Sequence, residues 1–300
     1  MMVRPVCFAG NLETAASNAF QEDASALDLE ELQRRALGEF DAMVEVLRAA
    51  DVRVHVFEDT PEPHTPDSIF PNNWVSFHAT GEVVLYPLLT PNRRAEVRVE
   101  LVREVERESG AAWPELIDLT TLEETGAFLE GTGSMVLDRA NRIAYACLSP
   151  RTTREGLDEF ARRMNYELVL FRALDRGGVA IYHTNVVMGI GERFAVVCLD
   201  AIRDADERRT VEARLVETDH EVIELTIEQL YSFAGNCLAV ESTRGEPLIV
   251  LSEQALSSLR PEQRASLAAH GRLLSTPLDT IESVGGGSAR CMLAEIHEPK

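Results

Sequence analysis

The stretch HTNVVMGIGERFAVVCL, residues 183–199, contains two short apolar runs, VVMGI and FAVVCL, separated by the polar turn GER. A segment with helical spacing of apolar residues follows at 205–217 (ADERRTVEARLVE), and EVIEL at 221–225 is again apolar and β-branched. Short runs of this composition between turns predict strands, and the spaced pattern predicts a helix. The stretch therefore begins a unit of strand, strand, helix and strand.

The same unit recurs along the chain. Its copies begin at Asn73, Ser134, Asn185 and Asn236, at intervals of 61, 51 and 51 residues, and one further step of 54 residues reaches the segment that contains Cys291. Regular recurrence of one supersecondary unit is the signature of a repeat architecture.

The last copy is incomplete, because only the apolar run CMLAEI, 291–296, remains before the chain ends. The missing parts are found at the other end of the chain. MVRPVCF (2–8) predicts a second strand, residues 28–50 an amphipathic helix, and VRVHVF (52–57) a third strand. One unit is therefore split between the two termini.

Five units that close into a ring predict an α/β fold, a five-bladed ββαβ α/β-propeller with one blade split across the termini. The helices would lie outside, and the first strand of each unit would face the axis, so that the strand starts meet at one central pocket. Residues 1–300 would form a single catalytic domain. An ordinary α+β sandwich without a ring is the alternative.

The composition limits the classes of function. A net charge of −21 argues against nucleic-acid and anionic-membrane partners, and Lys300 is the only lysine, which excludes a Schiff-base or P-loop lysine. No apolar stretch is long enough to span a membrane, and the first residues lack a secretory pattern. Five cysteines without CxxC spacing indicate a cytoplasmic protein with reduced thiols, in which Cys147 and Cys198, inside apolar runs, are buried hydrophobic residues.

Chemically active residues gather at the strand starts. DSIFPNNW (67–74), FLEGTGS (128–134), YHTN (182–185) and GGGSARCM (285–292) together bring a carboxylate, an imidazole and a thiol to equivalent positions of different units. This combination is typical of an activated cysteine nucleophile with an acid/base partner. No HExxH motif or other metal-ligand pattern is present, so neither a metal nor a cofactor is expected. The candidate residues are Asp67, Phe70, Asn73, Glu130, His183, Asn185 and Cys291.

Several of these motifs resemble those of the pentein, or guanidino-group-modifying, superfamily of arginine deiminases, dimethylarginine hydrolases and amidinotransferases. The matching segments are GGGSARCM around Cys291, LEG at Glu130, the segment at His183, and LSPRT (148–152). RPVCFAGNLETAASNAFQ (4–21), DSIFPNNW, YPLLTPNRR (86–94) and FAGNCL (233–238) look most like the citrulline-utilisation, or citrulline ureidase, branch. The resemblance implies a five-bladed ββαβ ring and a small amino-acid substrate.

The chain departs from the deiminase pattern at the residues that would hold the substrate. Deiminases usually have FTRD where this chain has FPNN, HxD where it has His-Thr-Asn, and EGGD where it has EGTG. Two aspartates that grip a guanidinium are thereby replaced by Asn73 and Asn185. A neutral ureido group offers both an acceptor and donors, and an asparagine supplies both in return. The alternative is a site that still binds arginine, through Asp67 and Glu130.

The resemblance implies a mechanism in which Cys291 attacks the ureido carbon, Glu130 holds the substrate nitrogen, and His183 transfers protons. Arg151, in LSPRT, would hold the substrate carboxylate, and Phe70 would line the pocket. Citrulline would give ornithine, carbon dioxide and ammonia. The alternatives are a deiminase or amidinotransferase acting on a cationic guanidine, and a pentein module that only binds a partner. The sequence leaves room for a homo-oligomer.

Overall fold

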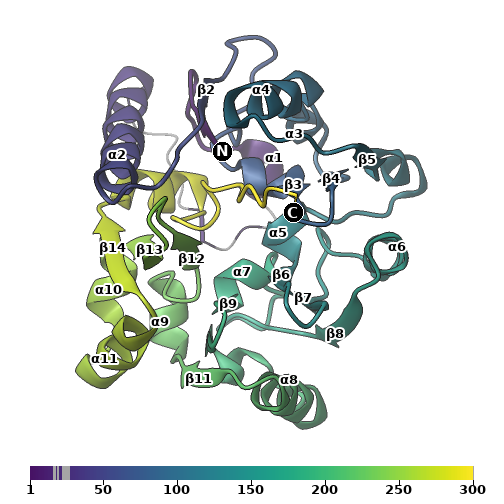
Figure 1. The fold of residues 1–300 in the computed structure, drawn as a ribbon, viewed down its shortest axis with the longest axis vertical. Helices are drawn as coiled ribbons and strands as arrows, with labels where there is room; N and C mark the ends of the chain where they lie inside the picture. Colours follow the sequence, from purple (N-terminus) through teal and green to yellow (C-terminus); the bar gives the residue numbers. More distant parts are fainter. Residues whose placement is uncertain (16–17, 19, 22–27, 300) are drawn as a thin grey trace.

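The computed structural model describes residues 1–15, 18, 20–21 and 28–299 of the chain. Residues 16, 17 and 19 of the motif at 4–21 lie outside this range. The described residues form an α/β structure with four three-stranded sheets and one two-stranded sheet. In Figure 1 these sheets follow one another in chain order around the centre of the molecule. The sequence predicted this succession of small sheets.

The three-stranded sheets share one topology, in which the first strand pairs antiparallel with the second and the third pairs parallel with the second. The parallel pairing requires a crossover, which a helix supplies in every case. The four sheets are β3 (Val75–Phe77), β4 (Glu82–Leu85) and β5 (Glu115–Asp118); β6 (Val136–Asp138), β7 (Ile143–Cys147) and β8 (Glu167–Phe171); β9 (Met188–Ile190), β10 (Phe194–Val197) and β11 (Glu221–Glu224); and β12 (Leu238–Glu241), β13 (Pro247–Ser252) and β14 (Arg272–Thr276).

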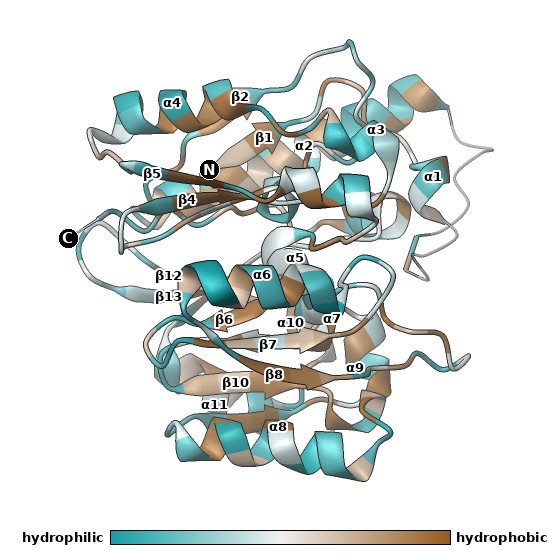
Figure 2. Cartoon of the chain, turned by 90° about the vertical axis from the view of Figure 1, so that its right-hand side faces the viewer, coloured by the Kyte–Doolittle hydropathy of each residue, from teal (hydrophilic) through white to brown (hydrophobic). Residues whose placement is uncertain are grey.

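The crossover helices lie on the outside of the sheets and present polar residues outward, whereas the strands are mostly apolar (Figure 2). They are α4 (Val99–Ser109), α6 (Arg154–Met164), α8 (Ala205–Glu217) and α11 (Pro261–His270), and each matches a predicted helical segment. The middle strands are mostly buried, and Cys147 in β7 and Cys198, directly after β10, are fully inaccessible, as predicted.

The long helix α2 (Leu29–Ala49) also forms where the sequence predicts it. The Asp28 side chain caps its first turn by accepting the backbone N–H groups of Glu30 and Glu31. Apolar residues at helical spacing make its buried face, which packs against β14. These residues are Leu32, Ala36, Phe40, Met43, Val44 and Leu47.

The split unit is only partly as predicted. β1 (Met2–Arg4) and β2 (Val56–Glu58) pair in parallel, but residues 291–296 form no strand. Among the described residues, Ala294 alone of this run forms backbone hydrogen bonds with β1 and the residue before it, through Met1 N to Ala294 O at 2.9 Å and Ala294 N to Met1 O at 3.1 Å. The Arg290 guanidinium bends this segment, because it donates to Leu293 O and to Glu295. The predicted first strand is therefore a turn joined to the N-terminus at one residue.

Short helical segments complete the structure: α1 (Leu12–Ala15), α3 (Pro91–Arg94), α5 (Gly131–Ser134), α7 (Thr184–Val187), α9 (Ile227–Tyr231) and α10 (Glu253–Ser258). Three 3₁₀ segments, η1 (Pro71–Asn73), η2 (Thr120–Thr125) and η3 (Leu199–Ala201), and one π-helical segment, η4 (Ile281–Gly285), are also present. Within the described residues, no helix is both long and apolar enough to cross a membrane.

Candidate active site

Four of the predicted residues lie on, or directly before, short helical turns that precede the first strands. η1 precedes β3 and carries Asn73, and α5 precedes β6 directly after Glu130. α7 precedes β9; His183 stands at its N-cap and Asn185 lies inside it. The three turns contact one another in the order η1, α5, α7. The recurring unit therefore does bring these side chains together, as predicted.

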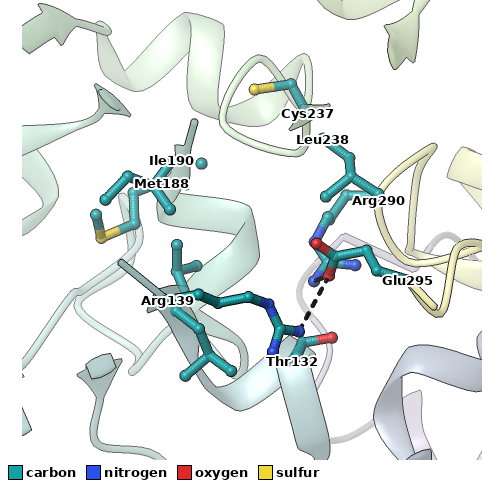
Figure 3. Close-up of a pocket in the computed structure, with 11 residues that line it drawn as sticks. Thr132, Arg139, Met188, Ile190, Cys237, Leu238, Arg290 and Glu295 are labelled. Carbon is teal, nitrogen blue, oxygen red and sulfur yellow. Dashed lines mark hydrogen bonds and ion pairs between the residues drawn. The ribbon is translucent and has the colours of Figure 1, made fainter. Parts of the chain in front are cut away.

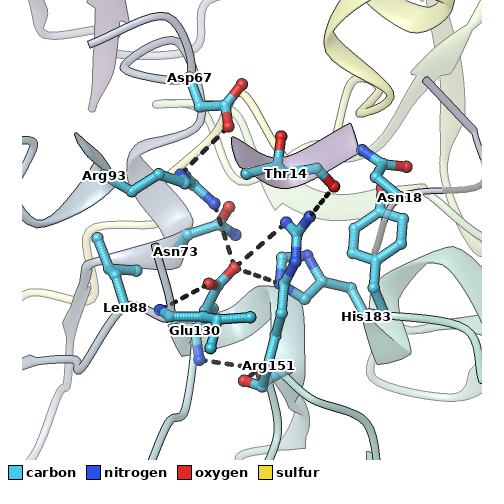
Figure 4. Close-up of polar contacts among 12 residues, drawn as sticks. Thr14, Asn18, Asp67, Asn73, Leu88, Arg93, Glu130, Arg151 and His183 are labelled. Atoms are coloured by element: carbon cyan, nitrogen blue, oxygen red, sulfur yellow. Dashed lines mark hydrogen bonds and ion pairs between the residues drawn. The ribbon is translucent and has the colours of Figure 1, made fainter. Parts of the chain in front are cut away.

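Glu130 is the centre of a buried polar network (Figure 4). Its Oε2 atom accepts from His183 Nε2 at 2.8 Å and from Arg93 Nη1 at 3.1 Å, and Arg151 Nη1 lies 3.6 Å away. Burial by itself raises the pKa of Glu130, but the charges of Arg151 and Arg93 and the hydrogen bond from His183 hold it well below its usual range. Glu130 is therefore an anion that the protein already neutralises.

His183 faces this carboxylate as a neutral imidazole. Burial lowers the pKa of His183 from 6.5 to about 4, against the raising effect of Glu130. An ionised carboxylate can only accept, so Nε2 carries the ring proton and Nδ1 is left as a base. Nδ1 lies on the side of Gly133, where an added Cβ would come within 2.7 Å of it. The geometry gives His183 an oriented tautomer with one basic nitrogen.

Arg93 is a part of the site that the sequence reasoning missed. The residue is 1% exposed, and its guanidinium forms two hydrogen bonds with Glu96 and also pairs with Glu130 and Asp67. Burial lowers the pKa of Arg93, but the three surrounding carboxylates raise it above its usual value. Asp67 also accepts from Asn11 Nδ2 at 2.8 Å. In the sequence, Arg93 belongs to the motif YPLLTPNRR, but the motif does not indicate what this arginine does.

Cys291 is reached by two amide groups. Asn185 Nδ2 lies 3.3 Å and Asn236 Nδ2 3.2 Å from its Sγ atom, and the thiol is 3% exposed. Asn185 lies two residues after His183, the N-cap of α7. The same short helix therefore places one side chain at the Cys291 thiol and the imidazole of His183 in the same site. Asn236 begins a repeat in the sequence, but it was not among the candidate residues.

The glycines before Cys291 allow close packing against Phe70. A Cβ at Gly287 would lie 2.8 Å from the Phe70 ring and 3.3 Å from Cys291 Cβ, so a larger residue would displace both. Gly286 has a φ of +66°, a conformation that favours glycine. The glycine run is therefore a tightly packed turn that places Cys291 beside Phe70.

Arg151 lies inside the same network. Its Nη2 atom donates to Thr14 O at 3.2 Å, and its guanidinium stacks on the Tyr182 ring at 4.7 Å. The predicted role of Arg151, binding of the substrate carboxylate, stays a prediction.

Two amide atoms of the site have no hydrogen-bond partner among the described residues. They are Nδ2 of Asn72, a donor, and Oδ1 of Asn185, an acceptor. The other end of the Asn72 amide, Oδ1, accepts from Asn73 Nδ2 at 3.0 Å. Buried polar atoms are normally paired, so these two are the natural places for a ligand to bind.

A second polar cluster surrounds a cavity of about 30 Å³, which Thr132, Cys237 and Arg290, close in sequence to the site residues, help to line. Arg139 and Glu295 face each other across it, 3.8 Å apart, and Met188 and Cys237 also line it (Figure 3). The volume is enough for one water molecule. Among the described residues, no group of His, Cys, Asp and Glu side chains could hold a metal ion.

Alanine at Gly133 is expected to slow catalysis about tenfold or more. Its Cβ would lie 2.5 Å from Asn73 Nδ2 and 2.7 Å from His183 Nδ1, so both side chains must shift. Displacements of a few tenths of an ångström in a catalytic group cost rate steeply. Steady-state kinetics would show the loss in kcat. Gly38→Ala is the control, because nothing lies within 4 Å of its added Cβ and α2 should become slightly more stable. Equal kcat for the two variants would contradict the geometry.

His183 is expected to make the fold sensitive to acid. The unfolded chain protonates this residue as the pH falls through 6.5, whereas the folded chain does so only near pH 4. The unfolded state therefore binds more protons in that window, and the free energy of unfolding falls as the pH decreases. Between pH 7 and pH 5, wild type should lose about 2 kcal/mol relative to His183→Gln, measured by urea unfolding. If the free energy of unfolding changes with pH by the same amount in the two proteins, His183 is not held neutral in the folded state.

Comparison with solved structures identifies the fold class. The N-terminal domain of ArgZ, a cyanobacterial arginine dihydrolase of the ornithine-ammonia cycle, crystallised with its substrate, matches with a TM-score of 0.75 at 19% identity, over 99% of this chain and 97% of that domain. This chain covers 40% of full-length ArgZ. A dimethylarginine dimethylaminohydrolase, as an adduct with S-methyl-L-thiocitrulline, matches with a TM-score of 0.63 at 16% identity, over 97% and 98% of the two chains. The fold is the α/β fold of the pentein structures.

The sequence itself identifies the family. The sequence model of the family described as "N,N dimethylarginine dimethylhydrolase, eukaryotic" matches residues 4–298. No curated protein matched the chain. The chain belongs to this family and is therefore an enzyme of the guanidino-modifying hydrolase class.

Proposed function

We propose that this enzyme hydrolyses the ureido group of citrulline to give ornithine, carbon dioxide and ammonia, and that it belongs to the citrulline ureidase branch of the pentein enzymes. The observation that carries the proposal is the pair of unpartnered amide atoms, Asn72 Nδ2 and Asn185 Oδ1. One is a donor and the other is an acceptor. A ureido group can satisfy both, because its carbonyl accepts and its N–H groups donate.

A guanidinium fits this pair less well. It carries only donors, so it would leave Asn72 Nδ2 without an acceptor, at a cost of about 1–3 kcal/mol for a buried group. The charges agree with this argument. Glu130 and Asp67 are the two carboxylates among the candidate residues, and both already pair with Arg93. A cationic substrate would find its charge poorly balanced, whereas a neutral one would leave these ion pairs intact.

The proposed reaction has two steps. The thiol proton of Cys291 passes to His183 Nδ1, and Sγ forms a bond to the ureido carbon. The bond from that carbon to the ornithine nitrogen then breaks, and this nitrogen takes the proton from His183. The carbamoyl group stays on sulfur. In the second step His183 removes a proton from water, whose oxygen bonds to the carbon as the S–C bond breaks. Carbamate is released and decomposes to carbon dioxide and ammonia.

The roles of the other residues are proposed to follow from their contacts. Glu130 fixes the His183 tautomer and binds the substrate nitrogen. Arg151 binds the substrate carboxylate, and Asn73 and Phe70 complete the pocket. The covalent route agrees with the solved structures of two fold relatives, a substituted ArgZ covalently bound to a reaction intermediate and the dimethylaminohydrolase adduct with a thiocitrulline derivative.

A second candidate substrate is arginine, which the enzyme would hydrolyse twice to reach ornithine. The similarity of the whole chain to the ArgZ domain favours this candidate, because ArgZ is an arginine dihydrolase. Both candidates need the same nucleophile, and they differ in the charge of the group that enters the site first.

The test is an assay of the purified protein with citrulline, arginine or dimethylarginine, in which ornithine, citrulline, ammonia and dimethylamine are measured. Ornithine from citrulline, with a higher kcat/KM than from arginine, supports the proposal. Ornithine formed faster from arginine supports the second candidate. Citrulline accumulating from arginine, amidine transfer to added glycine, or dimethylamine from dimethylarginine would overturn both. No product, together with no labelling of Cys291 by iodoacetamide, would indicate a module that only binds a partner.

We further propose that the sheets form a five-bladed propeller, with one blade split across the termini, and that residues 1–300 are one catalytic domain. The five cysteines, all free thiols, agree with a cytoplasmic location. The partner is a small amino acid, with no metal, cofactor, nucleic acid or membrane, and a homo-oligomer remains open.

A further inference from the structure

Asn236 lies next to the reacting sulfur in a fully buried position. It precedes β12, in the turn FAGNCL, and is 0% exposed. Its Nδ2 atom donates to Asn185 O at 3.0 Å and to Cys291 Sγ at 3.2 Å. Its Oδ1 atom accepts the backbone N–H of Arg290 at 2.9 Å. One amide thus connects the nucleophile, the residue before it, and α7.

These contacts fix which end of the amide faces the sulfur. The Arg290 N–H is a donor, so the atom that faces it must be the carbonyl oxygen, and the NH₂ group must point to Cys291. The backbone N–H of Arg290 therefore determines that the group of Asn236 facing Cys291 Sγ is the NH₂ donor. A turned amide would set two donors against each other at Arg290.

Asn236 and Asn185 are equivalent residues of consecutive repeats, 51 positions apart. Both direct Nδ2 at Cys291 Sγ, at 3.2 and 3.3 Å, so that two neutral donors converge on one sulfur. Preorganised N–H groups stabilise negative charge at low dielectric, as backbone amides do in an oxyanion hole. The two donors therefore come from the same position of two consecutive repeat units.

We propose that Asn236 is a catalytic residue, which with Asn185 forms a donor pair that holds the Cys291 sulfur in place and stabilises its negative charge. The proposal rests on the proposed function for the role of Cys291 as nucleophile and for the identity of the substrate. The pair acts twice. It stabilises the sulfur anion before the S–C bond forms, and again when water breaks that bond and the electron pair returns to sulfur.

The test compares wild type with Asn236→Asp and Asn236→Ala. Asn236→Asp keeps the shape and the acceptor for Arg290 N–H but replaces the donor at sulfur with a carboxylate oxygen. Asn165→Asp is the control, because it adds the same charge at an exposed αL position.

The first measurement needs no substrate: it is the rate at which iodoacetamide alkylates Cys291 at pH 7, followed by mass spectrometry of the Cys291 peptide. The thiolate is the form that reacts, so both Asn236 variants should react at about a tenth of the wild-type rate or less, and the control at the wild-type rate.

The second measurement is steady-state kinetics with citrulline. Removal of one preorganised donor should lower kcat about 10²-fold and change KM by less than about threefold. If the carboxylate of Asn236→Asp prevents folding, Asn236→Ser, which is smaller and keeps an O–H donor, should show an intermediate alkylation rate. Alkylation of the folded variants within twofold of wild type overturns the proposal. Wild type that is alkylated at Cys291 but does not act on citrulline refutes the proposed function alone, and the alkylation rates still decide the role of Asn236.

Discussion

Cys291→Ala is expected to abolish turnover, with a loss of about 10⁶-fold, because it removes the only nucleophile in the proposed reaction. The rest of the site should stay in place, since His183 and Arg93 both bind Glu130 and these contacts do not involve the sulfur. Single-turnover and steady-state assays with citrulline would measure the loss, and circular dichroism would verify the fold.

Cys198→Ala is the matched control. It deletes the same atom from a fully buried cysteine beside β10, in a part of the core that carries no candidate residue. The free energy of unfolding should decrease by about 1 kcal/mol, because a small cavity remains, and kcat should not change. Substantial activity in Cys291→Ala would exclude covalent catalysis. A large loss of activity in Cys198→Ala would show that removal of any core sulfur is harmful.

Much of the fold was predictable because it repeats. Each three-stranded sheet has the same order of apolar runs, and the periodicities of strands and helices differ enough to be distinguished within one unit. The error at residues 291–296 has a physical cause. The run CMLAEI is apolar enough for a strand, but the Arg290 guanidinium binds Leu293 O and Glu295 and turns the chain. A side-chain contact of this kind leaves no periodic signal.

The site was predictable where it follows the repeat and not elsewhere. Glu130, His183 and Asn185 lie at strand starts, so the spacing of the units brought them together. Arg93 lies on α3, outside the repeat pattern, and arginines usually lie at the surface. Its burial among three carboxylates is a property of the folded chain alone. Asn236 could have been found, because it occupies the same repeat position as Asn185.

The Asn73→Asp, Asn185→Asp double variant is expected to lose citrulline turnover and to bind arginine about a hundredfold more tightly. The change at Asn185 would remove one amide donor from Cys291 Sγ, 3.3 Å away, and would place a negative charge there instead. Glu130, near Asn73, already pairs with the positive charges of Arg93 and Arg151, so the two new carboxylates would lack balancing charge. A guanidinium supplies that charge together with N–H donors, and two charge-assisted hydrogen bonds are worth a few kcal/mol, or roughly a hundredfold in affinity.

Binding is the appropriate measurement for this change, because catalysis also requires alignment of the new carboxylates within a fraction of an ångström. Calorimetric titration of citrulline and arginine into both proteins, on the Cys291→Ala background, separates affinity from turnover. Citrulline should bind more tightly than arginine to the parent protein, and the order should reverse in the double variant. Asn165→Asp is again the control for added charge, and it should leave both affinities unchanged because Asn165 is exposed at the end of α6. If the parent protein already binds arginine more tightly than citrulline, the two asparagines do not select a neutral ureido group, and the first substrate of the enzyme is a cationic guanidine.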